Sequence, residues 1–203
     1  MLIDFGTKPA GDMIDELKID GKTGDIKRCD YNDGDRDETN ITKAFKAVFD
    51  FEHVLKGWRT FEGGYSEKFV YASEPMPTSP GPDWEMALKI KVKLAKACAG
   101  DGDGIRVVKT KARGVMKGLN DLSDQYNAGL KDNAGKLPVV ELDSVAKVKV
   151  KHGTVSEPKF KISGWVDRPE DLAPLTPTDG SATTSDRPPA TTAPAEEMAE
   201  DFG

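Results

Sequence analysis

Apolar and polar positions alternate most regularly between Met86 and Ala95, in the middle of the chain. Four aliphatic residues alternate there with three lysines. The aliphatic residues are Leu88, Ile90, Val92 and Leu94, and the lysines are Lys89, Lys91 and Lys93. A period of two places successive side chains on opposite faces of a strand. The segment is therefore predicted to be a half-buried β-strand with one apolar face and one lysine face.

The same alternation predicts three further strands, at 44–51, 137–151 and 159–166, and residues 105–109 are expected to return as the partner strand of a hairpin. Between Ala112 and Tyr126, apolar residues recur instead at intervals of three and four, which predicts an amphipathic helix. The run from Gly100 to Gly104 is expected to be a flexible turn.

Residues 53–83 contain eight Gly and Pro residues and are expected to form a long loop instead of one regular element. The loop and the residue just after it carry six aromatic side chains: Trp58, Phe61, Tyr65, Phe69, Tyr71 and Trp84. Loops of this length within compact domains are commonly functional.

The predicted order of elements is strand, aromatic loop, hairpin, helix and two more strands. A five-stranded antiparallel barrel with one helix between its third and fourth strands has this order, which is the OB-fold. The predicted fold class is therefore mainly β, with an OB-fold barrel. Oligonucleotides lie across the second and third strands of that fold and under two loops, here 53–83 and 153–158.

Composition divides the chain into three parts. Residues 1–25 are weakly patterned and expected to be a loosely ordered lead-in, and residues 26–172 are expected to form the folded domain. Residues 173–203 are rich in Pro, Thr and Ala and are expected to be a disordered acidic tail. The tail carries six acids and one Arg, so its −5 accounts for most of the −6 of the chain and leaves a nearly neutral body.

No apolar stretch is long enough to span a membrane, and the first residues lack the basic and apolar regions of a signal peptide. Cys29 and Cys98 lie far apart in unrelated contexts, which is typical of reduced thiols. We therefore expect a cytoplasmic protein with no membrane partner.

Basic residues are concentrated in two segments. Residues 86–117 hold nine Lys and Arg against two Asp, and residues 145–162 hold five Lys against one Glu. Lysines on an outer strand face can simply keep a sheet soluble. Two such sets in a nearly neutral body instead favour a groove for a polyanion. The residues expected to neutralise phosphates are Lys89, Lys91, Lys93, Arg106, Lys147 and Lys149.

Aromatic residues in the long loop are candidates for stacking on unpaired bases, which tolerates any base sequence. The residues expected to stack are Trp58, Tyr65, Tyr71 and Trp84. About half of the aromatic set is expected to belong to the core instead. A basic groove interleaved with aromatic rings suits a single strand better than a duplex.

Catalytic and metal-binding patterns are weak. The acidic run from Asp30 to Glu38 does not match a calcium-binding loop, because Cys29 would occupy the first position and no Glu stands at the twelfth. Neither His53 nor His152 lies in a recognisable motif, and zinc-ligand spacings and a phosphate-binding loop are absent. We expect a non-enzyme without cofactor or metal. A magnesium-dependent nuclease or resolvase using the acidic run remains an alternative.

The OB-like order of elements, the low-complexity tether and the acidic tip resemble the single-stranded DNA-binding proteins of bacteriophages and bacteria. The segments 57–62 and 160–169 are also similar in style to phage replication proteins of this kind. The resemblance implies sequence-independent binding of single-stranded DNA in phage replication or recombination, within the cytoplasm of a bacterial host.

In that family the acidic tip recruits replication and recombination proteins through a terminal aromatic residue. The resemblance implies this role for Glu196, Glu197, Glu200, Asp201 and Phe202. The chain departs from the bacterial pattern because Gly203 follows Phe202 and no Pro precedes it. A non-catalytic virion or assembly protein is the alternative from another class, and the sequence leaves open whether the chain forms a homo-oligomer.

Overall fold

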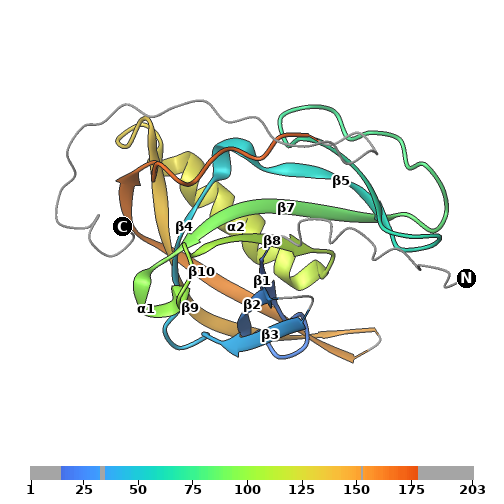
Figure 1. The fold of residues 1–203 in the computed structure, drawn as a ribbon, viewed down its shortest axis with the longest axis horizontal. Coiled ribbons are helices and arrows are strands. Elements are labelled where there is room, and N and C mark those ends of the chain that lie inside the picture. The colour runs from blue at the N-terminus through green and yellow to red at the C-terminus, as the bar shows by residue number, and fades with distance from the viewer. Residues whose placement is uncertain (1–14, 33–34, 152, 178–203) are drawn as a thin grey trace, which may run out of the picture.

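The structure is a computed structural model that describes residues 15–32, 35–151 and 153–177 (Figure 1). The tail residues expected to bind partners, from Glu196 to Phe202, lie outside the described residues. The strands are β1 (Glu16–Ile19), β2 (Ile26–Asn32), β3 (Asp35–Asn40), β4 (Lys46–Phe49), β5 (Leu55–Thr60), β6 (Ser66–Tyr71), β7 (Glu85–Leu94), β8 (Ile105–Thr110), β9 (Lys136–Val150) and β10 (Gly153–Asp167). The helices are a 3-10 turn, η1 (Phe51–His53), and two α-helices, α1 (Lys96–Ala99) and α2 (Arg113–Gly129).

The ten strands form one mixed sheet in the order β10-β9-β4-β7-β8-β1-β2-β3. The ladders are antiparallel except between β1 and β8, which run parallel. β7 is long enough to pair with β4 at its C-terminal end and with β5 at its N-terminal end, and β6 pairs with β5. The sheet therefore has three edges, formed by β3, β6 and β10.

The expected OB-fold barrel is wrong, because this sheet is open and has twice the strands of that barrel. The sheet does curl, since the Ser156 N–H of β10 donates to the Gly21 carbonyl in the β1–β2 turn at 2.9 Å. Among the described residues, however, no strand ladder joins this turn to the β9–β10 hairpin. β10 therefore contacts the β1–β2 turn, but this contact does not close a barrel.

The main core lies between α2 and the apolar face of the sheet. Buried residues on one side of the helix pack there: Val115, Leu119 and Leu122. Gly114 and Gly118 face β10 so closely that a Cβ on either would lie 2.3 Å from a carbonyl oxygen, that of Ser156 or Pro158. These glycines let the helix lie directly on β10. The opposite face of β7 is not covered by the helix.

A second, smaller apolar cluster lies on the lysine side of β7. It consists of Leu55, Phe69 and Ala87, with Tyr71 and Leu175 packed against it. Leu175 belongs to the segment after β10, which runs back over the sheet towards β5 (Figure 1). Leu172, just before it, is fully buried. The chain therefore remains packed on the sheet beyond residue 172, where the tail was expected to begin.

The strands predicted at 44–51, 86–95, 105–109, 137–151 and 159–166 all exist, and so does the helix. The long aromatic loop does not, because Leu55–Thr60 and Ser66–Tyr71 form a hairpin within it. β1 lies inside the segment expected to be a loosely ordered lead-in. β2 and β3 were not predicted, and together with β1 they extend the sheet beyond β8.

Candidate nucleic-acid interface

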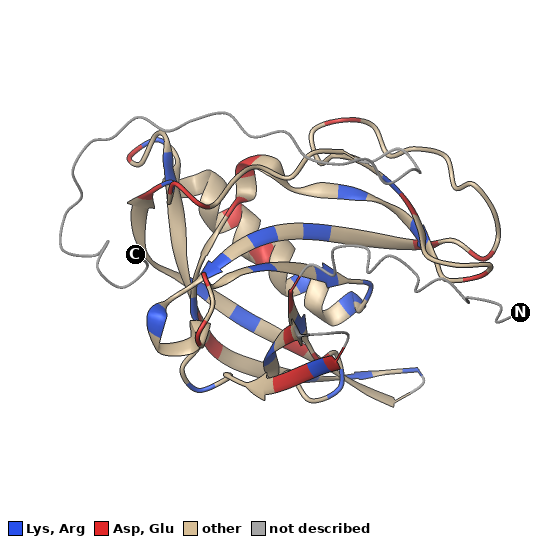
Figure 2. Cartoon of the chain, viewed as in Figure 1, with Lys and Arg blue, Asp and Glu red and all other residues tan. Residues whose placement is uncertain are grey.

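Side chains of β7 divide between the two faces of the sheet, and Ala87, Lys89, Lys91 and Lys93 share one of them. We call this side of the sheet the lysine face. Strand register continues it onto the neighbours, since Lys89 pairs with Leu55 on β5 and with Lys109 on β8. Figure 2 shows basic positions along β7 and on the neighbouring strands β5 and β8. The predicted lysine stripe is therefore part of a wider surface.

Five residues form the most prominent feature of this face, which we call the β5–β8 cluster: Arg59, Tyr65, Glu67, Lys89 and Lys109. The Lys89 ammonium donates to Glu67 at 2.5 Å, and the Tyr65 hydroxyl donates to the same carboxylate. The Lys109 ammonium lies 5.9 Å from the centre of the Tyr65 ring. One carboxylate therefore holds a lysine and a tyrosine in place beside a second lysine.

Two aromatic rings of the cluster region face solvent. Phe61 is 64% exposed and Tyr65 is 49% exposed, and their ring centroids are 5.3 Å apart. The Arg59 guanidinium carbon lies 5.4 Å from the centre of the Phe61 ring. The glycines at positions 63 and 64 both have positive φ, which permits the tight turn that joins these two rings. The turn thus presents two rings next to the cations Arg59 and Lys109.

Arg59 has no ion-pair partner among the described residues, and its Nε atom is buried without a hydrogen-bond partner. A guanidinium keeps its charge at every physiological pH and matches the geometry of phosphate oxygens. Burial lowers the pKa of Lys89, although its hydrogen bond to Glu67 partly offsets this effect. Arg59 is therefore the cation of the cluster with the most unsatisfied hydrogen-bonding capacity.

All three predicted phosphate ligands on β7 are less accessible than expected, and Lys89 is only 8% exposed. Lys93 is buried and its ammonium donates to both carboxylate oxygens of Asp171, at 2.8 and 2.9 Å. Lys91 is half-buried and has no ion-pair partner among the described residues. Burial lowers the pKa of Lys91, while the charge of Asp50 partly offsets it. The C-terminal segment thus occupies the end of the lysine face that lies near β4.

Arg106 does not reach the lysine face. It pairs with Val92 across the β7–β8 ladder, so its side chain lies on the apolar side, where it is 2% exposed. Its guanidinium forms ion pairs with Asp30 at 2.6 Å, Asp15 at 3.4 Å and Asp103 at 3.7 Å. Its chain neighbours Ile105 and Val107 are both apolar, so the local sequence pattern does not indicate which face of the strand Arg106 occupies.

Lys147 and Lys149 lie on β9, which is separated from β7 by β4. The Lys147 ammonium donates to the carbonyls of Lys22 and Thr23 and to the Ser156 hydroxyl, at 2.7 to 3.0 Å. Lys147 therefore fastens the β1–β2 turn to the β9–β10 hairpin. Lys149 is exposed. The structure does not bring these two lysines to the β5–β8 cluster.

The four predicted stacking residues do not lie together in the structure. Tyr65 lies in the cluster, whereas Tyr71 packs against the second apolar cluster under Leu175. Trp58 lies on the opposite face of β5, where its indole N–H donates to the Pro77 carbonyl at 2.7 Å. Trp84 is half-buried next to Gly81. The sequence did not point to Arg59, Phe61, Glu67 or Lys109, although the strand-forming run Phe69-Val70-Tyr71 is a signal for the second strand of the hairpin.

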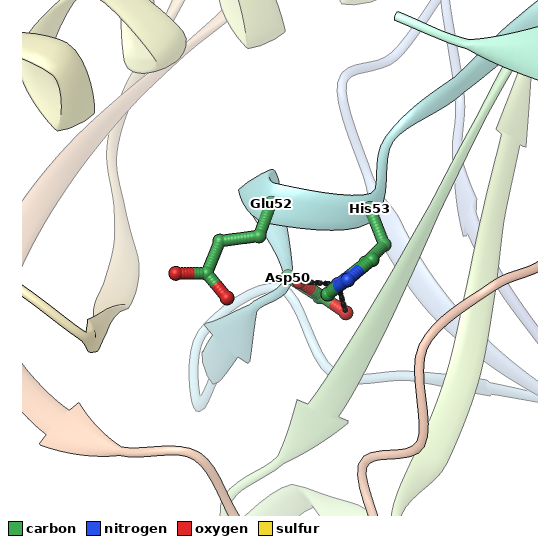
Figure 3. A group of neighbouring side chains, drawn as sticks. All are labelled: Asp50, Glu52 and His53. Carbon is green, nitrogen blue, oxygen red and sulfur yellow. Dashed lines mark hydrogen bonds and ion pairs between the residues drawn. The ribbon is translucent and has the colours of Figure 1, made fainter.

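A second group of polar residues lies at the end of β4. Asp50, Glu52 and His53 place possible ligand atoms within 4.8 Å of one another (Figure 3). Asp50 is fully buried, and the Arg168 guanidinium donates to both of its oxygens at 2.8 Å and to Glu52 at 2.8 Å. These three residues are the candidate metal ligands of the described chain. Because Arg168 already supplies the positive charge, the group serves as a clasp for the end of β10.

No protein family, curated protein or solved structure matches this chain. Among the described residues, no helix has both the length and the apolar character needed to cross a membrane. The function must therefore be argued from the lysine face itself.

Proposed function

We propose that this protein binds single-stranded DNA, without sequence preference, on the lysine face at the β5–β8 cluster. One observation carries the proposal: the exposed rings of Phe61 and Tyr65 lie beside the cations Arg59 and Lys109. Cations attract phosphates, and exposed rings stack on bases that have no pairing partner. The combination favours a single strand, since a duplex offers its phosphates but hides the faces of its bases.

In this proposal Arg59 and Lys109 contact phosphates, and Tyr65 and Phe61 provide stacking surfaces. Glu67 is a positioning residue, because its carboxylate holds both the Lys89 ammonium and the Tyr65 hydroxyl. The setting is DNA replication or recombination in the cytoplasm of a bacterial host, with replication and recombination proteins as partners of the acidic tail. No step of this function requires a cofactor.

Fluorescence anisotropy with labelled twelve-nucleotide oligo-dT tests the proposal. We expect binding that weakens linearly with the logarithm of salt concentration, and an unlabelled duplex of equal length should compete poorly. The double variant Arg59→Ala/Lys109→Ala should reduce the salt slope by about 0.7 for each lost phosphate contact. Lys43→Ala/Lys131→Ala, which removes two exposed charges outside the lysine face, is the charge-matched control.

Absence of salt-dependent oligo-dT binding would overturn the proposal and favour a virion or assembly protein whose lysines keep the sheet soluble. Magnesium-dependent cleavage of the oligonucleotide would instead favour a nuclease. Equal binding losses in this double variant and in Lys43→Ala/Lys131→Ala would show that only net charge matters and that the cluster is not a site.

A further inference from the structure

We propose that the bound strand continues across β8 and β1 to a second phosphate-binding cluster on β1, β2 and β3. This cluster, which we call the β1–β3 cluster, consists of Lys18, Lys27, Arg36, Glu38 and Tyr31. The proposal rests on the proposed function and adds a second subsite to it. The β1–β3 cluster lies in segments that the sequence alone assigned to a loosely ordered lead-in and to an acidic run.

Three cations from three adjacent strands converge on one carboxylate in this cluster. Glu38 forms ion pairs with Lys18 at 3.2 Å, Lys27 at 3.1 Å and Arg36 at 3.0 Å. Hydrogen bonds from Lys27 and then Lys18 lower the pKa of Glu38, so this carboxylate stays ionised. One negative charge against three positive charges leaves the cluster with a net charge of +2. Such a surplus favours an incoming phosphate.

The β1–β3 cluster repeats the composition of the β5–β8 cluster. Each contains one glutamate, several cations and a tyrosine, and the Arg36 guanidinium carbon lies 5.8 Å from the centre of the Tyr31 ring. Tyr31 is half-buried, whereas Tyr65 in the first cluster is more exposed. Both clusters therefore offer a ring together with cations held by a shared carboxylate.

Glu16 joins the two clusters into one continuous strip. Its carboxylate lies 3.5 Å from the Lys109 ammonium of the first cluster and accepts a hydrogen bond of 3.5 Å from the Tyr31 hydroxyl of the second. Strand register agrees, because Glu16 pairs with Val107 on β8 and with Cys29 on β2, both on the lysine face. A ligand that leaves Lys109 along this strip meets Tyr31 next.

Strand alternation places the acidic residues around β3 on two different faces of the sheet. Asp37 pairs with Asp30, whose carboxylate binds Arg106 on the apolar side of the sheet. Arg36 and Glu38 point to the lysine face instead, since their register partners are Tyr31 and Cys29. Asp35 and Asp37 therefore lie on the apolar side of the sheet. The lysine face carries Arg36 and one acid, Glu38.

The strand residues on this face, from β6 across to β3, include eight basic and four acidic side chains. The basic residues are Arg59, Lys89, Lys91, Lys93, Lys109, Lys18, Lys27 and Arg36, and the acidic residues are Glu67, Glu85, Glu16 and Glu38. The difference is +4, or +3 once Asp171, which binds Lys93, is included. The face is strongly basic within a chain whose total charge is −6.

Strand spacing sets the length of ligand that could use both clusters. Neighbouring strands lie about 4.8 Å apart, so the three steps from β7 to β2 span roughly 14 Å. A stacked strand advances about 3.4 Å per nucleotide, which makes this separation about four nucleotides. A four-nucleotide ligand should therefore fill one cluster, whereas an eight-nucleotide ligand should reach both.

Anisotropy titrations with labelled oligo-dT of four, eight and twelve nucleotides test the second subsite. For the unmodified full chain we expect affinity to rise by about tenfold or more between four and eight nucleotides. The double variant Lys27→Ala/Arg36→Ala should lose most of that gain and leave the four-nucleotide affinity unchanged. Its salt slope with eight nucleotides should fall by about 1.4, which corresponds to two phosphate contacts.

Arg36 also contacts the buried Cys29 thiol, so a second variant, Lys18→Gln/Lys27→Gln, tests the site without disturbing that packing. Lys43→Ala/Lys131→Ala again serves as the charge-matched control. Unchanged eight-nucleotide binding in both double variants would overturn the second subsite, as would equal losses at four and eight nucleotides. Failure of the unmodified chain to bind any oligo-dT would instead overturn the proposed function itself.

Discussion

Arg168 donates hydrogen bonds of 2.8 Å to both carboxylate oxygens of Asp50, a residue that precedes it by 118 positions. Asp50 follows β4, and Arg168 follows β10, so the pair joins the ends of two strands that are not neighbours in the sheet. Arg168 also donates to the Leu172 carbonyl at 3.1 Å. The clasp therefore directs the C-terminal segment onto the lysine face, where Asp171 and Leu175 make their contacts.

Arg168→Ala is expected to destabilise the protein strongly, because it leaves the buried charge of Asp50 without its guanidinium partner and with only the His53 ring nitrogen, 3.1 Å away, beside it. Loss of one member of a buried ion pair typically costs about 3–5 kcal/mol. Urea unfolding should show a lower midpoint, and Arg168→Lys should recover part of the loss. Arg113→Ala, at an exposed position in the first turn of α2, should change the stability little. A small effect of Arg168→Ala would contradict the structural role of the clasp.

Asp50 should also make the stability depend on pH. Burial raises the pKa of Asp50, but the hydrogen bonds and charge of Arg168 outweigh burial and bring it below the usual value of 3.8. A carboxyl whose pKa falls on folding stabilises the fold above its unfolded pKa, and this contribution disappears as pH falls through the folded value. The stability difference between the unmodified chain and Asp50→Asn should therefore be full at about pH 6 and shrink below about pH 4. A difference that stays constant over this range would argue against the assignment.

Gly57 is expected to tolerate no side chain. A Cβ at this position would lie 1.9 Å from the Lys68 carbonyl oxygen of β6, so Gly57→Ala must push the two strands of the hairpin apart. We expect a lower melting temperature and weaker oligo-dT binding, since the hairpin holds Arg59 and Tyr65 in place. Gly102→Ala in an exposed turn, where the nearest atom lies 3.7 Å away, is the control. Equal melting temperatures for the two variants would refute the close approach.

Tyr65 and Trp58 should respond differently to substitution, although both are aromatic residues of the same hairpin. Tyr65→Ala should weaken oligo-dT binding by about 1–3 kcal/mol, the usual value of one stacking contact, and Tyr65→Phe should retain most of it. Trp58→Phe should leave binding unchanged and cost about 1 kcal/mol of stability, because it removes the hydrogen bond to Pro77. Weaker binding by Trp58→Phe at equal stability would show that the ligand uses the other face of β5.

Removal of residues 178–203 is expected to strengthen oligo-dT binding at low salt. This segment carries six acids and one Arg, so the truncated chain loses a charge of −5 while all described contacts remain. The advantage should fade as salt rises, because charges further apart than about 10 Å are screened at 0.1 M salt. A full-length variant with the six acids changed to amides should behave like the truncation. Equal or weaker binding by both variants would show that the tail does not compete for the face.

Strong alternation made β7 predictable, because its buried apolar face leaves a period of two in the sequence. β8 was predictable as the strand that returns after the glycine-rich turn. β3 left no such trace, since its six residues are all polar and five of them are exposed. It is a strand because β2 supplies its hydrogen bonds. The β5–β6 hairpin was obscured by glycines, which here make a tight turn and a close strand approach instead of an irregular loop.

The sequence predicted the type of site better than it predicted the residues that form it. A lysine stripe next to aromatic residues was visible in the sequence, and Lys89 and Tyr65 do lie in the β5–β8 cluster. Lys93 was removed from the accessible set by Asp171, and Arg106 by its position on the apolar face. Such partners are distant in the chain, so no local pattern could identify them.

By itself, the sequence determined the mainly β character, the central strands, the helix and the concentration of negative charge in the tail. These follow from local periodicity and composition, which act over a few residues. Only the tertiary structure decided that the sheet stays open, which cations share a face, and which of them are neutralised by partners. These outcomes depend on strand register and on contacts across as many as 118 residues, where a shift of one position exchanges the two faces of a strand.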